Sequence, residues 1–160
     1  MIRAGTLLML IITLSEACDK QPTSLTVKVA SASGDLVVVS VRNDSPRDVV
    51  LLSPMTPNRI VDPGACTLKL STKLDDIIRP FAFTPELVIL RSGAEQRFRV
   101  LLDPAYLPKT CDTWSVTTEY AYVNSDEIAG FRSKPSEELR QHILRNQHVA
   151  TATDLVARNE

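Results

Sequence analysis

The sequence predicts a mostly β protein, an antiparallel β-sandwich of short strands followed by a short C-terminal helix. Several segments alternate apolar and polar side chains with the period of two that half-buried strands require. Turn residues separate these segments, and the chain has ten prolines but only five glycines, which is typical of short strands joined by proline-bearing loops. Together these features favour two packed antiparallel sheets.

The first half of the domain contains four predicted strands. A half-buried strand alternates apolar and polar residues, whereas a central strand is a run of β-branched residues. By these criteria strands are expected at residues 25–29, 36–42, 49–52 and 66–71. Residues 53–64 contain three prolines and are predicted to form a loop. The alternation from Cys66 to Ser71 places the Cys66 side chain on an inward face.

Three further strands are predicted in the second half, at residues 87–90, 96–102 and 114–123. In the second of these, Phe98 faces inward while Arg97 and Arg99 face outward together with Glu95. Arg97 and Arg99 are the predicted binding residues, for an acidic partner. The alternative is that they belong to a charged, solvated strand face.

The C-terminal residues 129–160 change in character and predict a helical segment. Serine, proline and two glutamates at its start suit a first helical turn, and Leu139 and Ile143 give it a narrow apolar stripe. Residues 148–157 alternate weakly after the helix. They are expected to form either an edge strand or a frayed tail.

The N-terminus, residues 1–17, has the three parts of a secretory signal peptide. Arg3 supplies the positive charge, residues 4–14 are uncharged and mostly apolar, and Ser15 and Ala17 offer small residues for cleavage. The apolar run is too short to span a bilayer, which takes about 20 residues. The roughly 140 residues after it suit one domain with its own core.

Cys18 follows the predicted cleavage site directly, as in bacterial lipoprotein signals, and residues 14–18 resemble a lipobox. This resemblance implies a lipid anchor on Cys18, a linker over residues 18–24, and a membrane-anchored protein of the periplasm or cell envelope. Asp19 resembles the signal that retains such lipoproteins at the inner membrane. The alternative is ordinary cleavage that leaves Cys18 as a free or paired thiol.

Cys66 and Cys111 are the two remaining cysteines. In an oxidising compartment two cysteines of one small domain usually pair, and their spacing matches no metal motif. A disulfide between them is therefore expected, with two free core thiols as the alternative.

The charge balance and the motif content exclude several functions. Lys and Arg number 18 against 19 for Asp and Glu, so no basic field for nucleic acid is expected. Nucleophile, phosphate-loop and dinucleotide motifs are missing, and His142 and His148, six residues apart, do not share a helix face as the i, i+4 pair of a zinc helix does. We therefore predict no enzyme, no catalytic or metal-binding residue and no cofactor. Trp114, Tyr120 and Tyr122 share one strand face, either as core or as an aromatic ligand platform.

Several of these segments resemble the first domain of periplasmic pilus-assembly chaperones. The resemblance is carried by residues 80–85 (Pro-Phe-Ala-Phe-Thr-Pro), Gly93, the strand residues 98–100, the Leu-Pro pair 107–108, and the Asn-containing turn at the end of 39–45. It covers residues 25–123 and implies an immunoglobulin-like sandwich over 25–128. The chain is too short for that family's second domain, and residues 109–112 replace its acidic-arginine signature. Lys28 lies one residue out of register with its first-strand arginine.

These observations predict a non-enzymatic bacterial envelope protein that binds another envelope protein or an extended peptide strand. The resemblance implies a chaperone-like role in the assembly of pili or surface structures. Pairing at a sheet edge is the expected route, provided that residues 148–157 leave the edge open. One alternative is a structural lipoprotein accessory of a secretion or conjugation apparatus. Another is an inhibitor or hydrolase with a site in the loops at 53–64 and 103–112.

Overall fold

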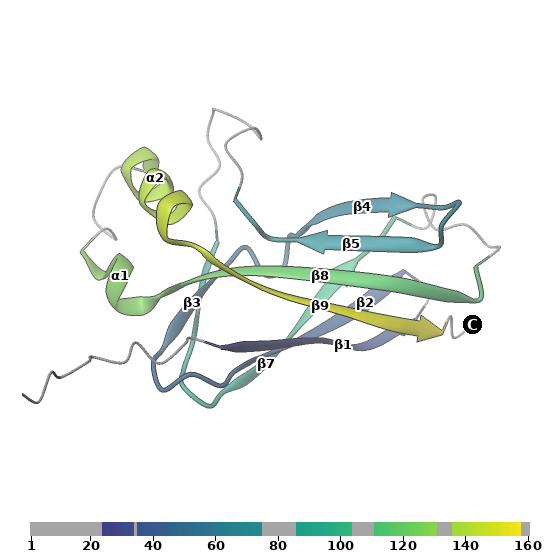
Figure 1. The fold of residues 1–160 in the computed structure, drawn as a ribbon, viewed down its shortest axis with the longest axis horizontal. Coiled ribbons are helices and arrows are strands. Elements are labelled where there is room, and N and C mark those ends of the chain that lie inside the picture. The colour runs from purple at the N-terminus through teal and green to yellow at the C-terminus, as the bar shows by residue number, and fades with distance from the viewer. Residues whose placement is uncertain (1–23, 34, 75–85, 104–110, 131–135, 158–160) are drawn as a thin grey trace, which may run out of the picture.

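The computed structural model describes residues 24–33, 35–74, 86–103, 111–130 and 136–157 (Figure 1). Over these residues the protein is mostly β, with two sheets and short helices, which confirms the predicted class. The smaller sheet has three antiparallel strands in the order β1-β2-β7. They are β1 (Leu25–Ser33), β2 (Leu36–Asn43) and β7 (Glu95–Leu101).

The larger sheet is built around β8 (Thr113–Asn124), the longest strand. One side of β8 pairs with β9 (His148–Ala157), and the two run side by side in Figure 1. The other side pairs first with β5 (Thr67–Ser71) and then with β3 (Val49–Leu52). β4 (Asn58–Asp62) pairs with β5, and β6 (Leu87–Leu90) pairs with β3.

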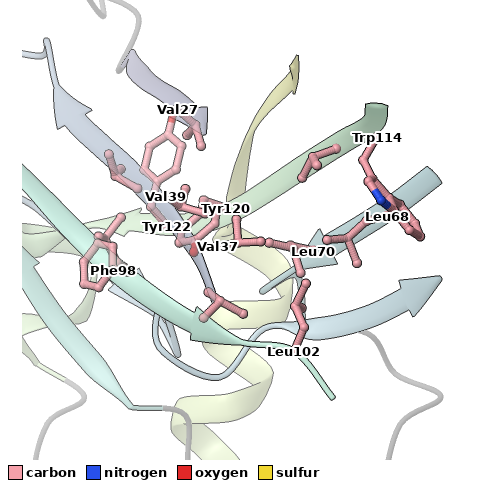
Figure 2. Close-up of a cluster of buried hydrophobic side chains, with 14 of the residues drawn as sticks. Val27, Val37, Val39, Leu68, Leu70, Phe98, Leu102, Trp114, Tyr120 and Tyr122 are labelled. Atoms are coloured by element: carbon pink, nitrogen blue, oxygen red, sulfur yellow. The ribbon is translucent and has the colours of Figure 1, made fainter. Parts of the chain in front are cut away.

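Inward side chains of both sheets form one hydrophobic cluster, part of which is drawn in Figure 2. Tyr120 is fully buried, and its hydroxyl donates a hydrogen bond of 3.1 Å to the carbonyl oxygen of Pro54. The Tyr120 ring also stacks on Phe98 of the other sheet, with ring centroids 6.2 Å apart. Trp114 and Tyr122 are buried too. The aromatic stripe is therefore core and not a ligand platform.

A second, smaller cluster lies on the outer side of the larger sheet. It forms where α1 (Ser125–Ala129) and α2 (Ser136–Asn146) pack against β3 and the end of β8. Buried residues of the cluster are Val50, Leu52, Ala121, Val123, Ile128, Leu139 and Ile143. The predicted apolar stripe of the helix is confirmed, since Leu139 and Ile143 are its buried residues.

Three details differ from the sequence-based predictions. Residues 58–62, predicted as part of a loop, form the exposed edge strand β4, because three prolines flank the strand without interrupting it. Cys66 is not on an inward strand face but in the β4–β5 turn, with a φ of +54°. β5 pairs with β8 in parallel, so the larger sheet is not purely antiparallel.

The C-terminal segment 129–160, predicted to be helical, contains both α2 and a strand. β9 pairs with β8 from His148 to Ala157, so of the two alternatives for residues 148–157 the strand is confirmed and the frayed tail is not. The predicted signal peptide, Cys18, and the resemblance segments 80–85 and 107–108 lie outside the described residues.

Candidate functional site

Cys66 and Cys111 are the first predicted site residues that the structure brings together. Their Sγ atoms lie 2.03 Å apart, as in a disulfide, in agreement with the predicted pair. This bridge joins the β4–β5 turn to the start of β8, and the Cys66 carbonyl accepts a hydrogen bond from the Ser115 amide. The pair thus has a structural position within the larger sheet.

Arg97 and Arg99 lie on the outer face of the three-stranded sheet, as predicted. The strand register places Arg97 opposite Ser40, which is in turn opposite Lys28 of β1. Arg42 lies opposite Glu95 one row away, and Arg99 lies opposite Val38. We call Lys28, Arg42, Arg97 and Arg99 the cationic face. The sequence carried a signal for three of them, since Lys28, Arg97 and Arg99 occupy the polar positions of alternating strands, whereas Arg42 ends a run of mostly β-branched residues.

Glu95 is held within this face by Ser40 and its basic neighbours. Although Ser40 points outward, it is only 1% exposed, and its hydroxyl donates a hydrogen bond to the Glu95 carboxylate. This hydrogen bond is the main cause of a pKa of Glu95 below its usual value; desolvation opposes it, and the charges of Lys28, Arg97 and Arg42 lower the pKa further. Glu95 is therefore ionised at neutral pH and directed toward β2.

Two arginines of the cationic face remain available to a partner. Arg42 is engaged by Asp44, at 2.8 Å. By contrast, the Arg97 side chain is 70% exposed and its Nε lies 3.9 Å from Glu95, a contact that contributes little at a surface. Arg99 is exposed, and no ion pair joins it to any residue in the described ranges. The cationic face has four basic side chains and two neighbouring carboxylates, Glu95 and Asp44, so it carries an excess of two positive charges.

β7 also forms an edge of its sheet. In the described part of the chain it has a strand neighbour on one side only, β2. The amide of Asn43 donates to the Ala94 carbonyl, and the amide of Leu102 donates to the Asp35 carbonyl, so even-numbered residues direct their backbone groups toward β2. Because these directions alternate in an antiparallel pair, the N–H and C=O groups of Arg97, Arg99 and Leu101 point to the side of β7 that no described strand covers. We call this side the open edge of β7.

The edge of β1, in contrast, is occupied. The β1 amide of Val29 points away from β2 and donates to Asp154 of β9, with an N···O distance of 2.8 Å. The edge that the sequence suggested at residues 148–157 is itself paired with β8. The condition for the open edge expected from the sequence, an unpaired segment 148–157, is therefore not met, whereas β7 lies at an edge that the sequence did not indicate, because strand neighbours are set by tertiary packing.

The described residues offer no metal site, and their two histidines have structural contacts. No group of three or more His, Cys, Asp or Glu side chains there is placed to hold a metal ion. His142 contacts the Glu127 carbonyl at 2.8 Å, and His148 packs against the Tyr122 ring. Neither α1 nor α2 has the length and apolarity needed to cross a membrane.

Comparison with known proteins identifies no relative: no family model, no curated protein and no solved structure matches this chain. The class that its fold and site define is a mostly β protein with a cationic sheet face beside a strand edge that none of the described strands covers.

Proposed function

We propose that this protein is an exported, non-enzymatic binding protein of the bacterial cell envelope, with a chaperone-like role. It binds an extended segment of another envelope protein at the open edge of β7. The observation that carries this proposal is the coincidence of free backbone groups and exposed arginine side chains at Arg97 and Arg99. A free edge supplies main-chain hydrogen bonds to an incoming strand, and the side chains beside it select the sequence.

The fold supports this proposal in a general way. Two sheets that share one core, with inward aromatic residues from both, suit an immunoglobulin-like sandwich. An unprotected strand edge is a liability in solution, and proteins usually cover it or use it. Here the β1 edge is covered by Asp154, whereas β7 has no such contact from the described residues. We infer that the β7 edge is retained for binding.

The proposal is tested by blocking the edge without disturbing the core. Arg99→Pro removes an amide that points away from β2, so the β2–β7 hydrogen bonds are retained. A photo-crosslinking amino acid at position 101 reports the partner in living cells, and the same group at exposed position 60 on β4 is the control. We expect one defined product from position 101, lost in Arg99→Pro but kept in Arg99→Gln. Equal products from both positions, or products insensitive to Arg99→Pro, would refute strand pairing.

Membrane attachment through Cys18 is a separate proposal, supported by the lipobox-like residues 14–18. The presence or absence of this lipid anchor also distinguishes a structural lipoprotein accessory from a diffusing chaperone. Cells grown with radiolabelled fatty acid should label the native protein but not Cys18→Ser. An unlabelled native protein of the cleaved mass would show that the signal is processed without lipidation.

A further inference from the structure

We infer that the segment bound at β7 carries acidic side chains at two alternate positions, separated by an apolar residue. This inference rests on the proposed function, because it describes the partner of the same edge. Arg97 and Arg99 direct their backbone groups to the open edge and also expose their side chains, whereas Phe98 between them is buried. The inference follows from this difference.

A strand added to β7 places its side chains on the same two faces as those of β7. Residues directly opposite each other on neighbouring strands have Cβ atoms about 4.5–5.5 Å apart, close enough for their side chains to interact. The partner residues beside Arg97 and Arg99 therefore lie on the outer, cationic face. The partner residue between them lies on the inner face beside Phe98, which belongs to the core cluster. That position favours an apolar side chain.

The charge of the outer face selects carboxylates for the two outer positions. The excess of positive charge favours them electrostatically, and a guanidinium binds a carboxylate with two parallel hydrogen bonds. Each opposite-charge pair across strands contributes modestly, so two pairs correspond to about 2- to 30-fold in affinity. Main-chain hydrogen bonds at the strand edge supply the remaining affinity, and the arginines determine which sequences bind preferentially.

The outer-face residues on either side of the two arginines, Glu95 and Leu101, determine which partner residues are favoured at the two ends of the motif. Glu95 lies before Arg97 on the same face, so an acidic partner residue beside Glu95 would be repelled. Leu101 lies after Arg99, is 61% exposed and is opposite Leu36, which favours an apolar partner residue there. The outer-face residues of the bound segment are therefore expected to be non-acidic beside Glu95, acidic beside Arg97 and Arg99, and apolar beside Leu101.

Synthetic peptides test this pattern directly. We would use nine-residue peptides, blocked at both ends, with valine at the inward positions. Of the two flanking outer positions, the one beside Glu95 carries a non-acidic residue and the one beside Leu101 carries leucine. The two central outer positions carry glutamate, serine or lysine. Affinities for the native protein, for Arg97→Glu/Arg99→Glu and for Arg59→Glu are measured by fluorescence anisotropy at two salt concentrations. Arg59 is an exposed arginine of β4 in the other sheet and serves as the matched control.

We expect the native protein to bind the glutamate peptide about 2- to 30-fold more tightly than the serine peptide, and the lysine peptide least. The double variant should prefer lysine, Arg59→Glu should resemble the native protein, and added salt should reduce the glutamate preference. Equal binding of the three peptides, abolished by Arg99→Pro, would overturn the acidic motif and leave the proposed strand pairing intact. Binding of none of the peptides would overturn both.

Discussion

The carboxylate of Asp154 in β9 accepts a hydrogen bond from the backbone amide of Val29 in β1, with an N···O distance of 2.8 Å. Among the described strands, β1 is at an edge of the smaller sheet, and β9 pairs only with β8 in the larger one. The bond therefore ties an edge of one sheet to an edge of the other. It satisfies an amide that the β1–β2 ladder leaves unpaired, and an inward-pointing charge at an edge discourages pairing with other chains.

Replacing Asp154 with alanine should destabilise the protein by about 1–2 kcal/mol, because a hydrogen bond to a charged group is lost at a half-buried site. Hydrogen exchange should also accelerate at the Val29 amide more than at the other β1 amides. The matched control is Thr151→Ala, an exposed β9 position. An unchanged exchange rate at Val29 would contradict the role given to Asp154.

Replacing Ser40 with alanine should raise the pKa of Glu95 toward its ordinary value of 4.5, because the hydroxyl that donates to the carboxylate is the main cause of the lowered pKa. A lowered folded-state pKa stabilises the protein above the unfolded-state pKa, and this contribution is lost as pH falls through the folded-state pKa. The stability difference between the native protein and Ser40→Ala should therefore shrink as pH falls below about 4. NMR titration of the Glu95 carboxyl measures the shift, and identical titration curves would refute it.

Tyr120→Phe should cost about 1–2 kcal/mol, because it leaves the buried carbonyl of Pro54 without its donor while keeping the ring stacked on Phe98. Denaturant unfolding gives the free energy. Thr117→Val is the control, since its hydroxyl bonds Thr153 at an exposed site where water replaces the partner. Equal effects of the two substitutions would show that the Tyr120 hydrogen bond has no special weight.

Reduction of the Cys66–Cys111 bridge should lower the free energy of unfolding by about 2–4 kcal/mol, because the cross-link closes a separation of 45 residues in the unfolded chain. Urea unfolding with and without a reductant measures the loss. A Cys66→Ser/Cys111→Ser variant should match the reduced protein and show no response to reductant. A native protein equally stable in both conditions would mean that the bridge does not constrain the unfolded state.

Much of the local structure was predictable from residue patterns. The strand at 96–102 was expected with Phe98 inward and Arg97 and Arg99 outward, and that is how β7 lies. Period-two alternation depends only on the chain's own geometry, so it survives in any sheet with one buried face. The pairing of Cys66 with Cys111 was also predictable, since the assignment of Cys18 to a lipid anchor leaves two cysteines and one possible connection.

What the sequence determined by itself is therefore most of the strands, though not β4, the buried side of strands such as β7, and the fact that Arg97 and Arg99 share an exposed face. Only the tertiary structure decided which strands are neighbours: β9 beside β8, β5 parallel to β8, and β7 at an edge. The physical reason is that alternation specifies the faces of a strand but not its two hydrogen-bonding edges, whose backbone groups are the same for every residue except proline. The candidate site depends on such an edge, so it became visible only once the sheets were assembled.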